Sequence, residues 1–82
     1  MAIYGMTPVQ CRMARAALGL GVLDLAKLAD VSTNTIVRFE RGEALKQMTV
    51  DHLRSVLEAA GVEFIPENGS GPGVRLAKNT MR

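Results

Sequence analysis

The chain has a single cysteine and no long apolar run. Cys11 cannot form an internal disulfide, which is typical of proteins that work in the reducing cytoplasm. No apolar segment approaches the roughly 20 residues that cross a bilayer. Met1–Thr7 has no basic cluster followed by an apolar segment, so we expect neither a signal peptide nor a membrane partner. These absences indicate a cytoplasmic protein.

The residues of familiar catalytic and metal sites are also scarce. His52 is the only histidine, and with no partner at ligand spacing it is best interpreted as an exposed helical side chain. Residues 68–73 are rich in glycine, but no helix follows them as one does in a dinucleotide-binding motif. Cys11 falls on an apolar stripe, so we expect it in the core. We therefore predict no enzyme, no metal site and no cofactor.

Length and composition allow one small folded domain. Hydrophobic residues make up 48% of the 82 residues and charged residues 22%, so the chain can build a core. The net charge of only +2 neither favours nor excludes nucleic acid as a partner. Dimerisation would add stability to so small a domain.

Apolar residues recur at helical spacing in four segments, each with a start or stop signal. Thr7 is the expected N-cap before Pro8, Ser32 caps the third helix, and Thr49 caps the fourth after a loop over 43–48. The expected helices run over about 8–18, 22–29, 33–41 and 50–60.

The apolar period changes after Gly61. Val62–Phe64 and Val74–Leu76 alternate in polarity and flank a stretch dense in turn residues, which predicts two short strands. The predicted fold class is mainly α, with four helices and a short C-terminal β-hairpin or strand pair. We expect a flexible N-terminal arm over 1–6, a helical domain over 7–61, a strand–loop–strand segment over 62–77 and a flexible tail over 78–82.

The second and third expected helices are short and separated by a tight turn, as in a helix-turn-helix. The small residues Ala26 and Ala29 would let the two helices cross closely. Ile36 and Phe39 would point inward from the third helix, which leaves its polar residues outside. Such a helix can lie in the major groove of DNA.

The sequence resembles the lambda-repressor-like (Cro-type, or xenobiotic-response-element) helix-turn-helix family over about residues 7–60. The resemblance rests on the motifs Arg15–Leu20, Leu25–Ala26, Ala29–Ile36 and Phe39–Gly42. The tail ending in Pro72–Leu76 is also similar to short bacterial members, which are mainly transcriptional regulators. The resemblance implies a four-helix DNA-binding domain that acts on double-stranded DNA as a homodimeric repressor.

The family pattern implies which residues contact bases. Thr33, Asn34 and Arg38 match positions that contact base edges, and Val37 is near enough to meet a thymine methyl group. Asparagine suits adenine and arginine suits guanine, since each makes a bidentate match in the major groove.

Other positions match contacts to the DNA backbone and a structural pair. Ser32, Arg41 and Lys46 would hold phosphates. Arg15 and Glu40 match a pair that joins the first helix to the end of the third, the recognition helix. Such a pair fixes the relative position of the two helices more than it adds stability.

The sequence departs from the family pattern in two places. Gly21 and Val22 stand where the family usually has a polar cap and a glutamine that binds a phosphate, and Asp24 two residues later would repel one. Asp30 replaces the usual turn glycine, but aspartate tolerates the left-handed conformation, so we expect the turn to survive.

Three classes of function remain open. The first is the DNA-binding repressor. The second is an antitoxin-like regulator that also binds a toxin, through its tail or through Val22 and Leu23. The third is a protein-interaction bundle without DNA binding.

The dimer is expected to form through the segment 62–76. An isolated hairpin is marginal in water and has open edges, which pairing with a second copy would cover. Phe64, Val74 and Leu76 would then be buried between the copies. The alternative is that the hairpin folds back and only caps its own core.

Overall fold

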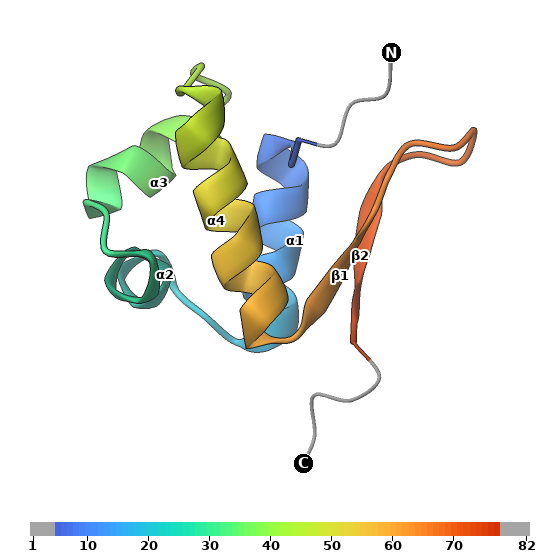
Figure 1. Cartoon of the computed structure of the whole chain (residues 1–82), viewed down its shortest axis with the longest axis horizontal. Coiled ribbons are helices and arrows are strands. Elements are labelled where there is room, and N and C mark those ends of the chain that lie inside the picture. The colour runs from blue at the N-terminus through green and yellow to red at the C-terminus, as the bar shows by residue number, and fades with distance from the viewer. Residues whose placement is uncertain (1–4, 78–82) are drawn as a thin grey trace.

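A computed structural model describes residues 5–77 of the chain. The fold is mainly helical with one short two-stranded antiparallel sheet, as the sequence predicts (Figure 1). The expected tail over 78–82 and residues 1–4 of the expected arm lie outside the described residues. The helices are α1 (Pro8–Leu18), α2 (Val22–Ala29), α3 (Thr33–Glu40) and α4 (Gln47–Ala60), and the strands are β1 (Val62–Ile65) and β2 (Gly73–Leu76).

Helix α1 begins in a capping box. The Thr7 hydroxyl accepts a hydrogen bond from Gln10 N at 3.1 Å, and Gln10 Oε1 accepts one from Thr7 N at 3.0 Å. The buried Gln10 amide also donates to the carbonyls of Ile65 and Gly73, at 3.1 and 2.9 Å. One side chain therefore caps α1 and ties it to both strands.

Helices α2 and α3 are joined by a tight turn at Asp30. This residue adopts the left-handed conformation (φ 58°, ψ 47°). The expectation that the turn forms with an aspartate at this position is therefore confirmed. Ser32 then caps α3 by accepting from Thr35 N at 3.1 Å. Figure 1 shows α2 nearly end-on while α3 lies across the view, so the two helices cross.

Helix α4 begins earlier than predicted. Lys46 is its N-cap and Gln47 its first residue, so the expected cap at Thr49 is wrong. Thr49 N donates to Lys46 O at 2.9 Å, which extends the first turn towards the loop. Along α4, His52 Nε2 lies 2.8 Å from the carbonyl oxygen of Ala29, so this exposed histidine links α4 to the end of α2.

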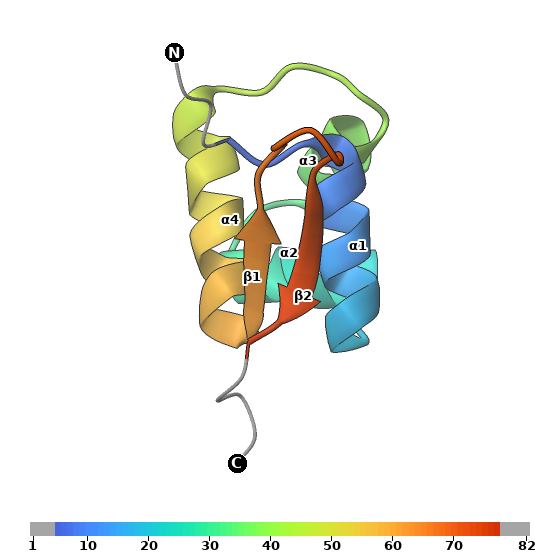
Figure 2. The ribbon, with the colours of Figure 1, turned by 90° about the vertical axis from the view of Figure 1, so that its right-hand side faces the viewer.

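The two strands form a hairpin that covers α1 and α4. Phe64 pairs with Val74 and Val62 with Leu76, in antiparallel register. Strand β1 lies beside α4 and β2 beside α1 (Figure 2). The hairpin therefore lies on the opposite side of α1 and α4 from α3 (Figure 1).

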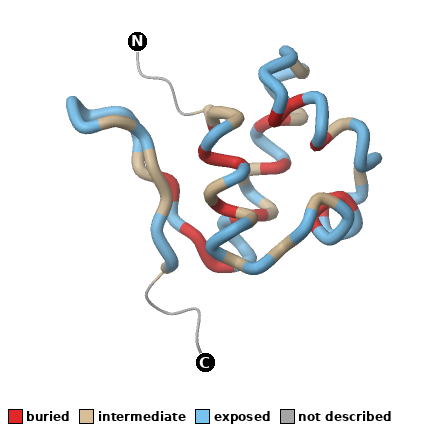
Figure 3. The backbone as a smooth tube through the Cα atoms, turned by 180° about the vertical axis from the view of Figure 1, so that it is seen from behind, coloured by how far each residue is buried: buried red, intermediate tan, exposed pale blue. Residues whose placement is uncertain are grey.

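The core lies where the four helices and the hairpin face one another (Figure 3). Met6 belongs to it with 4% of its surface exposed, so the expectation of a flexible arm is wrong at this residue. Helix α2 contributes three buried residues and α3 two apolar ones. The core consists of Met6, Cys11, Ala14, Leu25, Ala26, Ala29, Ile36, Phe39, Val50, Leu53, Leu57, Val62 and Phe64.

In the described part of the chain, no helix has both the length and the apolar character to cross a membrane.

Candidate nucleic-acid interface

The outer face of α3 carries the four residues predicted to contact bases. Ile36 and Phe39 are buried in the core and fix the rotation of the helix. The opposite face is exposed and combines a hydroxyl, an amide, a branched apolar side chain and a guanidinium. These exposed residues are Thr33, Asn34, Val37 and Arg38.

An open hollow runs from this face to the start of α4. It has a volume of about 540 Å³, and Ser32, Arg38 and Lys46 all line it. Two predicted backbone contacts, from different segments of the chain, thus lie beside a predicted base contact. Lys46 is exposed, and the start of α4 has no capping side chain. A helix start without a cap attracts anions, as does a lysine, so a phosphate would be favoured here.

Glu43 pairs with Arg38 of this surface and with Arg41, the exposed residue that follows the last residue of α3. Glu43 Oε1 accepts from Arg38 Nε at 2.9 Å, and Glu43 Oε2 accepts from Arg41 Nη2 at 2.7 Å. These two hydrogen bonds, the one from Arg38 first, hold the pKa of the Glu43 carboxyl below its ordinary value. Glu43 was not among the predicted site residues, although its position two residues after Arg41 and five after Arg38 could have suggested the contact.

Arg15 and Glu40 form the predicted ion pair, which is confirmed. Arg15 Nε and Nη2 each donate to one oxygen of Glu40 at 2.7 Å, in a bidentate arrangement. Arg12 Nη1 donates to the Glu40 carbonyl. These bonds join α1 to the last residue of α3 and so hold the exposed face of α3 in place.

Burial and hydrogen bonds act in opposite directions on Glu40. Burial alone would raise the pKa of its carboxyl, but the bonds from Arg15 and Cys11 outweigh that effect and the pKa lies below its ordinary value. The Cys11 thiol is fully buried, as expected for a core cysteine. Its burial, together with the bond to Glu40, raises its pKa far above the ordinary value, so it is not a reactive thiolate.

The start of α2 carries a carboxylate where a phosphate-binding helix start would have a free N–H group or a polar side chain. Asp24 Oδ2 accepts from Gly21 N at 2.8 Å, so the helix start is satisfied by the chain's own carboxylate. Val22 packs against the core, whereas Leu23 is 57% exposed. Of this apolar pair, only Leu23 is open to a partner.

The three residues expected at the dimer interface differ in how far they are buried within the chain itself. Phe64 fills the chain's own core, so the prediction that it is buried between two copies is wrong, and Val74 is partly buried against the same core. Their inward face is covered by α1 and α4. Leu76, at 56% exposure, is still open to a second copy.

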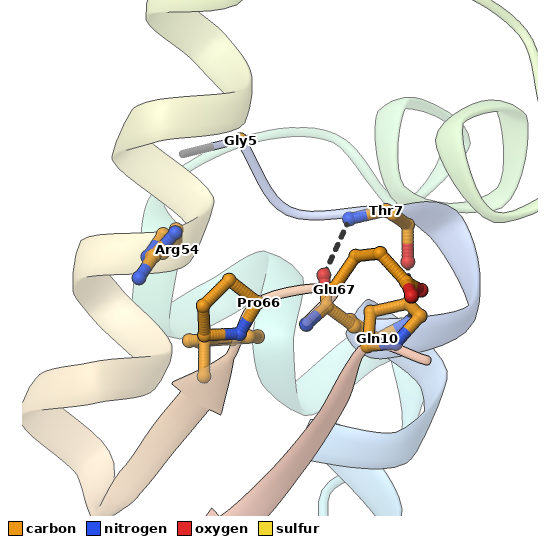
Figure 4. Close-up of a pocket in the computed structure, with 8 residues that line it drawn as sticks. Gly5, Thr7, Gln10, Arg54, Pro66 and Glu67 are labelled. Carbon is orange, nitrogen blue, oxygen red and sulfur yellow. Dashed lines mark hydrogen bonds between the residues drawn. The ribbon is translucent and has the colours of Figure 1, made fainter. Parts of the chain in front are cut away.

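A second pocket of about 170 Å³ lies between the start of α1, α4 and the hairpin loop (Figure 4). Its main polar groups are already engaged. Gln10 bonds Thr7 and both strands, and Glu67 Oε2 accepts from Gly69 N and Gly71 N at 2.9 and 3.3 Å. Arg54 lies over the Phe64 ring, 5.0 Å from its centre. The exposed cations and amide of α3 therefore make the stronger candidate site.

No model of a known protein family matches the chain, and a search of the curated proteins finds no match either. The function is therefore inferred from the site itself.

Proposed function

We propose that the chain is a transcriptional regulator that binds specific sequences in double-stranded DNA. In this proposal α2 and α3 form a helix-turn-helix of the lambda-repressor-like type, and α3 lies in the major groove. The protein acts in the cytoplasm as a homodimeric repressor.

The observation that carries the proposal is the exposed face of α3 beside the hollow at α4. Asn34 and Arg38 present the amide and guanidinium that match adenine and guanine edges. Ser32 and Lys46 line this hollow, and in the proposal the backbone of the same duplex passes beside them. The core contacts of Ile36 and Phe39 hold this face rigidly outward, which a base-contacting helix requires.

The dimer is supported by the open edge of the hairpin. Among the described residues β1 and β2 pair only with each other, so each strand has one unpaired edge. One recognition helix contacts only a few base pairs, and two held about 34 Å apart would meet successive turns of the duplex. Pairing of β2 with β2 of a second copy, with Leu76 at the contact, would supply the connection.

A second candidate is an antitoxin-like regulator that binds both DNA and a partner protein. The feature on which this candidate rests is Leu23 on α2, a large apolar side chain that is 57% exposed and that a partner protein would cover. A bundle that binds only proteins is the third outcome.

The deciding experiment is selection of bound sites from random duplex DNA, followed by a salt titration on the selected site. A regulator enriches one motif, expected to be a palindrome if the protein is a dimer. Enrichment of no motif, with only weak salt-sensitive binding, would refute the proposal and favour the protein-interaction bundle.

A further inference from the structure

Glu43 is held in place by the backbone that follows α3. Its N–H donates to the Arg38 carbonyl at 3.0 Å, and Gly42 N donates to the Phe39 carbonyl at 2.9 Å. Gly42 has a φ of 99°, a backbone conformation that glycine adopts readily and residues with a side chain rarely adopt. This turn brings the chain back so that the Glu43 carboxylate lies between Arg38 and Arg41.

The contact with Glu43 leaves the two terminal nitrogens of the Arg38 guanidinium free. Only Nε is bonded to Glu43, and within residues 5–77 neither terminal nitrogen of Arg38 has a hydrogen-bond partner. A bidentate contact to guanine O6 and N7 can be made by those two nitrogens. Glu43 can therefore keep its bond to Arg38 while Arg38 contacts a base.

The same carboxylate weakens attraction to phosphates. Arg38, Arg41 and Lys46 carry three positive charges at the proposed interface, and Glu43 reduces the sum to two. The Glu43 carboxylate lowers the attraction of both arginines for a phosphate in DNA of any sequence, and at Arg41 the phosphate must also displace Glu43 from Nη2. Binding that depends on charge alone is thus reduced, whereas a guanine edge is not penalised.

We propose that Glu43 is a specificity-determining residue, which aligns Arg38 for a guanine edge and suppresses binding of the arginines to DNA of any other sequence. This inference rests on the proposed function and goes beyond it, because it assigns the discrimination to an acidic side chain. It needs no contact between Glu43 and DNA.

The test compares the wild type, Glu43→Gln and Glu58→Gln on two duplexes. One duplex carries the site obtained by selection and the other a shuffled sequence of the same composition. Glu58→Gln is the matched control, since it makes the same charge change at an exposed carboxylate that pairs with Arg54 at 3.1 Å, in the last turn of α4. Circular dichroism checks that each variant remains folded.

Glu43→Gln should tighten binding to the shuffled duplex. One more neutralised phosphate steepens the salt slope by about 0.9, which changes affinity roughly 3.5-fold between about 50 and 200 mM salt. Affinity for the selected site should stay the same or fall, because a neutral amide with one acceptor oxygen holds Arg38 less firmly than the carboxylate that now bonds both arginines. The specificity ratio should thus fall in Glu43→Gln, by roughly threefold more at about 50 mM salt than at about 200 mM, and it should stay unchanged in Glu58→Gln.

The outcomes separate the inference from the function on which it rests. Equal tightening on both duplexes, an unchanged ratio, or the same fall in Glu58→Gln would overturn the role of Glu43 while the wild type still prefers its site. If the wild type prefers no selected site, the proposed function fails, and the role of Glu43 fails with it.

Discussion

Replacing Arg15 with alanine tests the ion pair that holds α3 against α1. The Glu40 side chain is only 8% exposed and its bonds to Arg15 are bidentate, so Arg15→Ala leaves a carboxylate that is buried and without its main cation. Such a carboxylate destabilises the folded state, because it has lost its hydration and no longer has a paired cation to compensate for that loss.

The size of the effect follows from burial. Removing one partner of a fully buried pair costs about 3–5 kcal/mol. The Arg15 side chain is 18% exposed, so water reaches part of the site, and we expect a loss of about 2–3 kcal/mol for this pair. A domain of this length has a total stability of roughly 4–12 kcal/mol. The melting temperature should therefore fall by roughly 10–20 °C.

The loss should depend on pH in a defined direction. The pKa of Glu40 is lower in the folded state than its ordinary value, so the pair stabilises the fold above the unfolded pKa of about 4.3. That contribution is lost as the pH falls through the folded pKa. The difference between wild type and Arg15→Ala should be largest near neutral pH and should narrow below about pH 4.

Urea unfolding followed by circular dichroism, at neutral and acid pH, measures both effects. Arg75→Ala is the matched control, because Arg75 pairs with Glu63 at 2.8 Å but both side chains are at least half exposed. An exposed pair contributes at most about 1 kcal/mol. Equal losses in the two variants, or a loss in Arg15→Ala that does not change with pH, would refute the reasoning.

Four further expectations concern DNA binding and assembly. Arg38→Ala should cost about 1–3 kcal/mol on the selected site and relax the preference at one base pair per half-site, whereas uniform weakening on all sequences would make Arg38 a backbone contact. Lys46→Ala should lower the salt slope by about one unit and weaken binding to every sequence, and Arg41→Ala should lower it by less because Glu43 pairs with Arg41; an unchanged slope in both would remove them from the interface. Val22→Gln should lower thermal stability without tightening DNA binding, because Val22 packs on the core, and a gain in affinity would contradict this. Leu76→Lys should leave the fold intact but shift sedimentation from dimer to monomer, and an unchanged dimer would exclude the edge of β2.

Local chemistry explains the parts of the fold that the sequence predicts correctly. Thr7 and Ser32 cap α1 and α3 because a side-chain oxygen meets a free N–H within the same turn. Asp30 takes the left-handed turn because its short side chain tolerates it. The outward face of α3 follows from the spacing of Ile36 and Phe39 alone. Each of these features depends on residues within a few positions of one another.

The sequence by itself thus determined the four helices apart from the start of α4, the hairpin and the exposed face of α3, since their causes are local. The Arg15–Glu40 pair was predicted only through the family resemblance. Only the tertiary structure decided that Phe64 belongs to the chain's own core and not to a dimer interface, because burial depends on where α1 and α4 lie. It also brought Lys46 to the hollow beside Arg38, because the position of the loop depends on how α4 packs on the other helices and not on any local pattern.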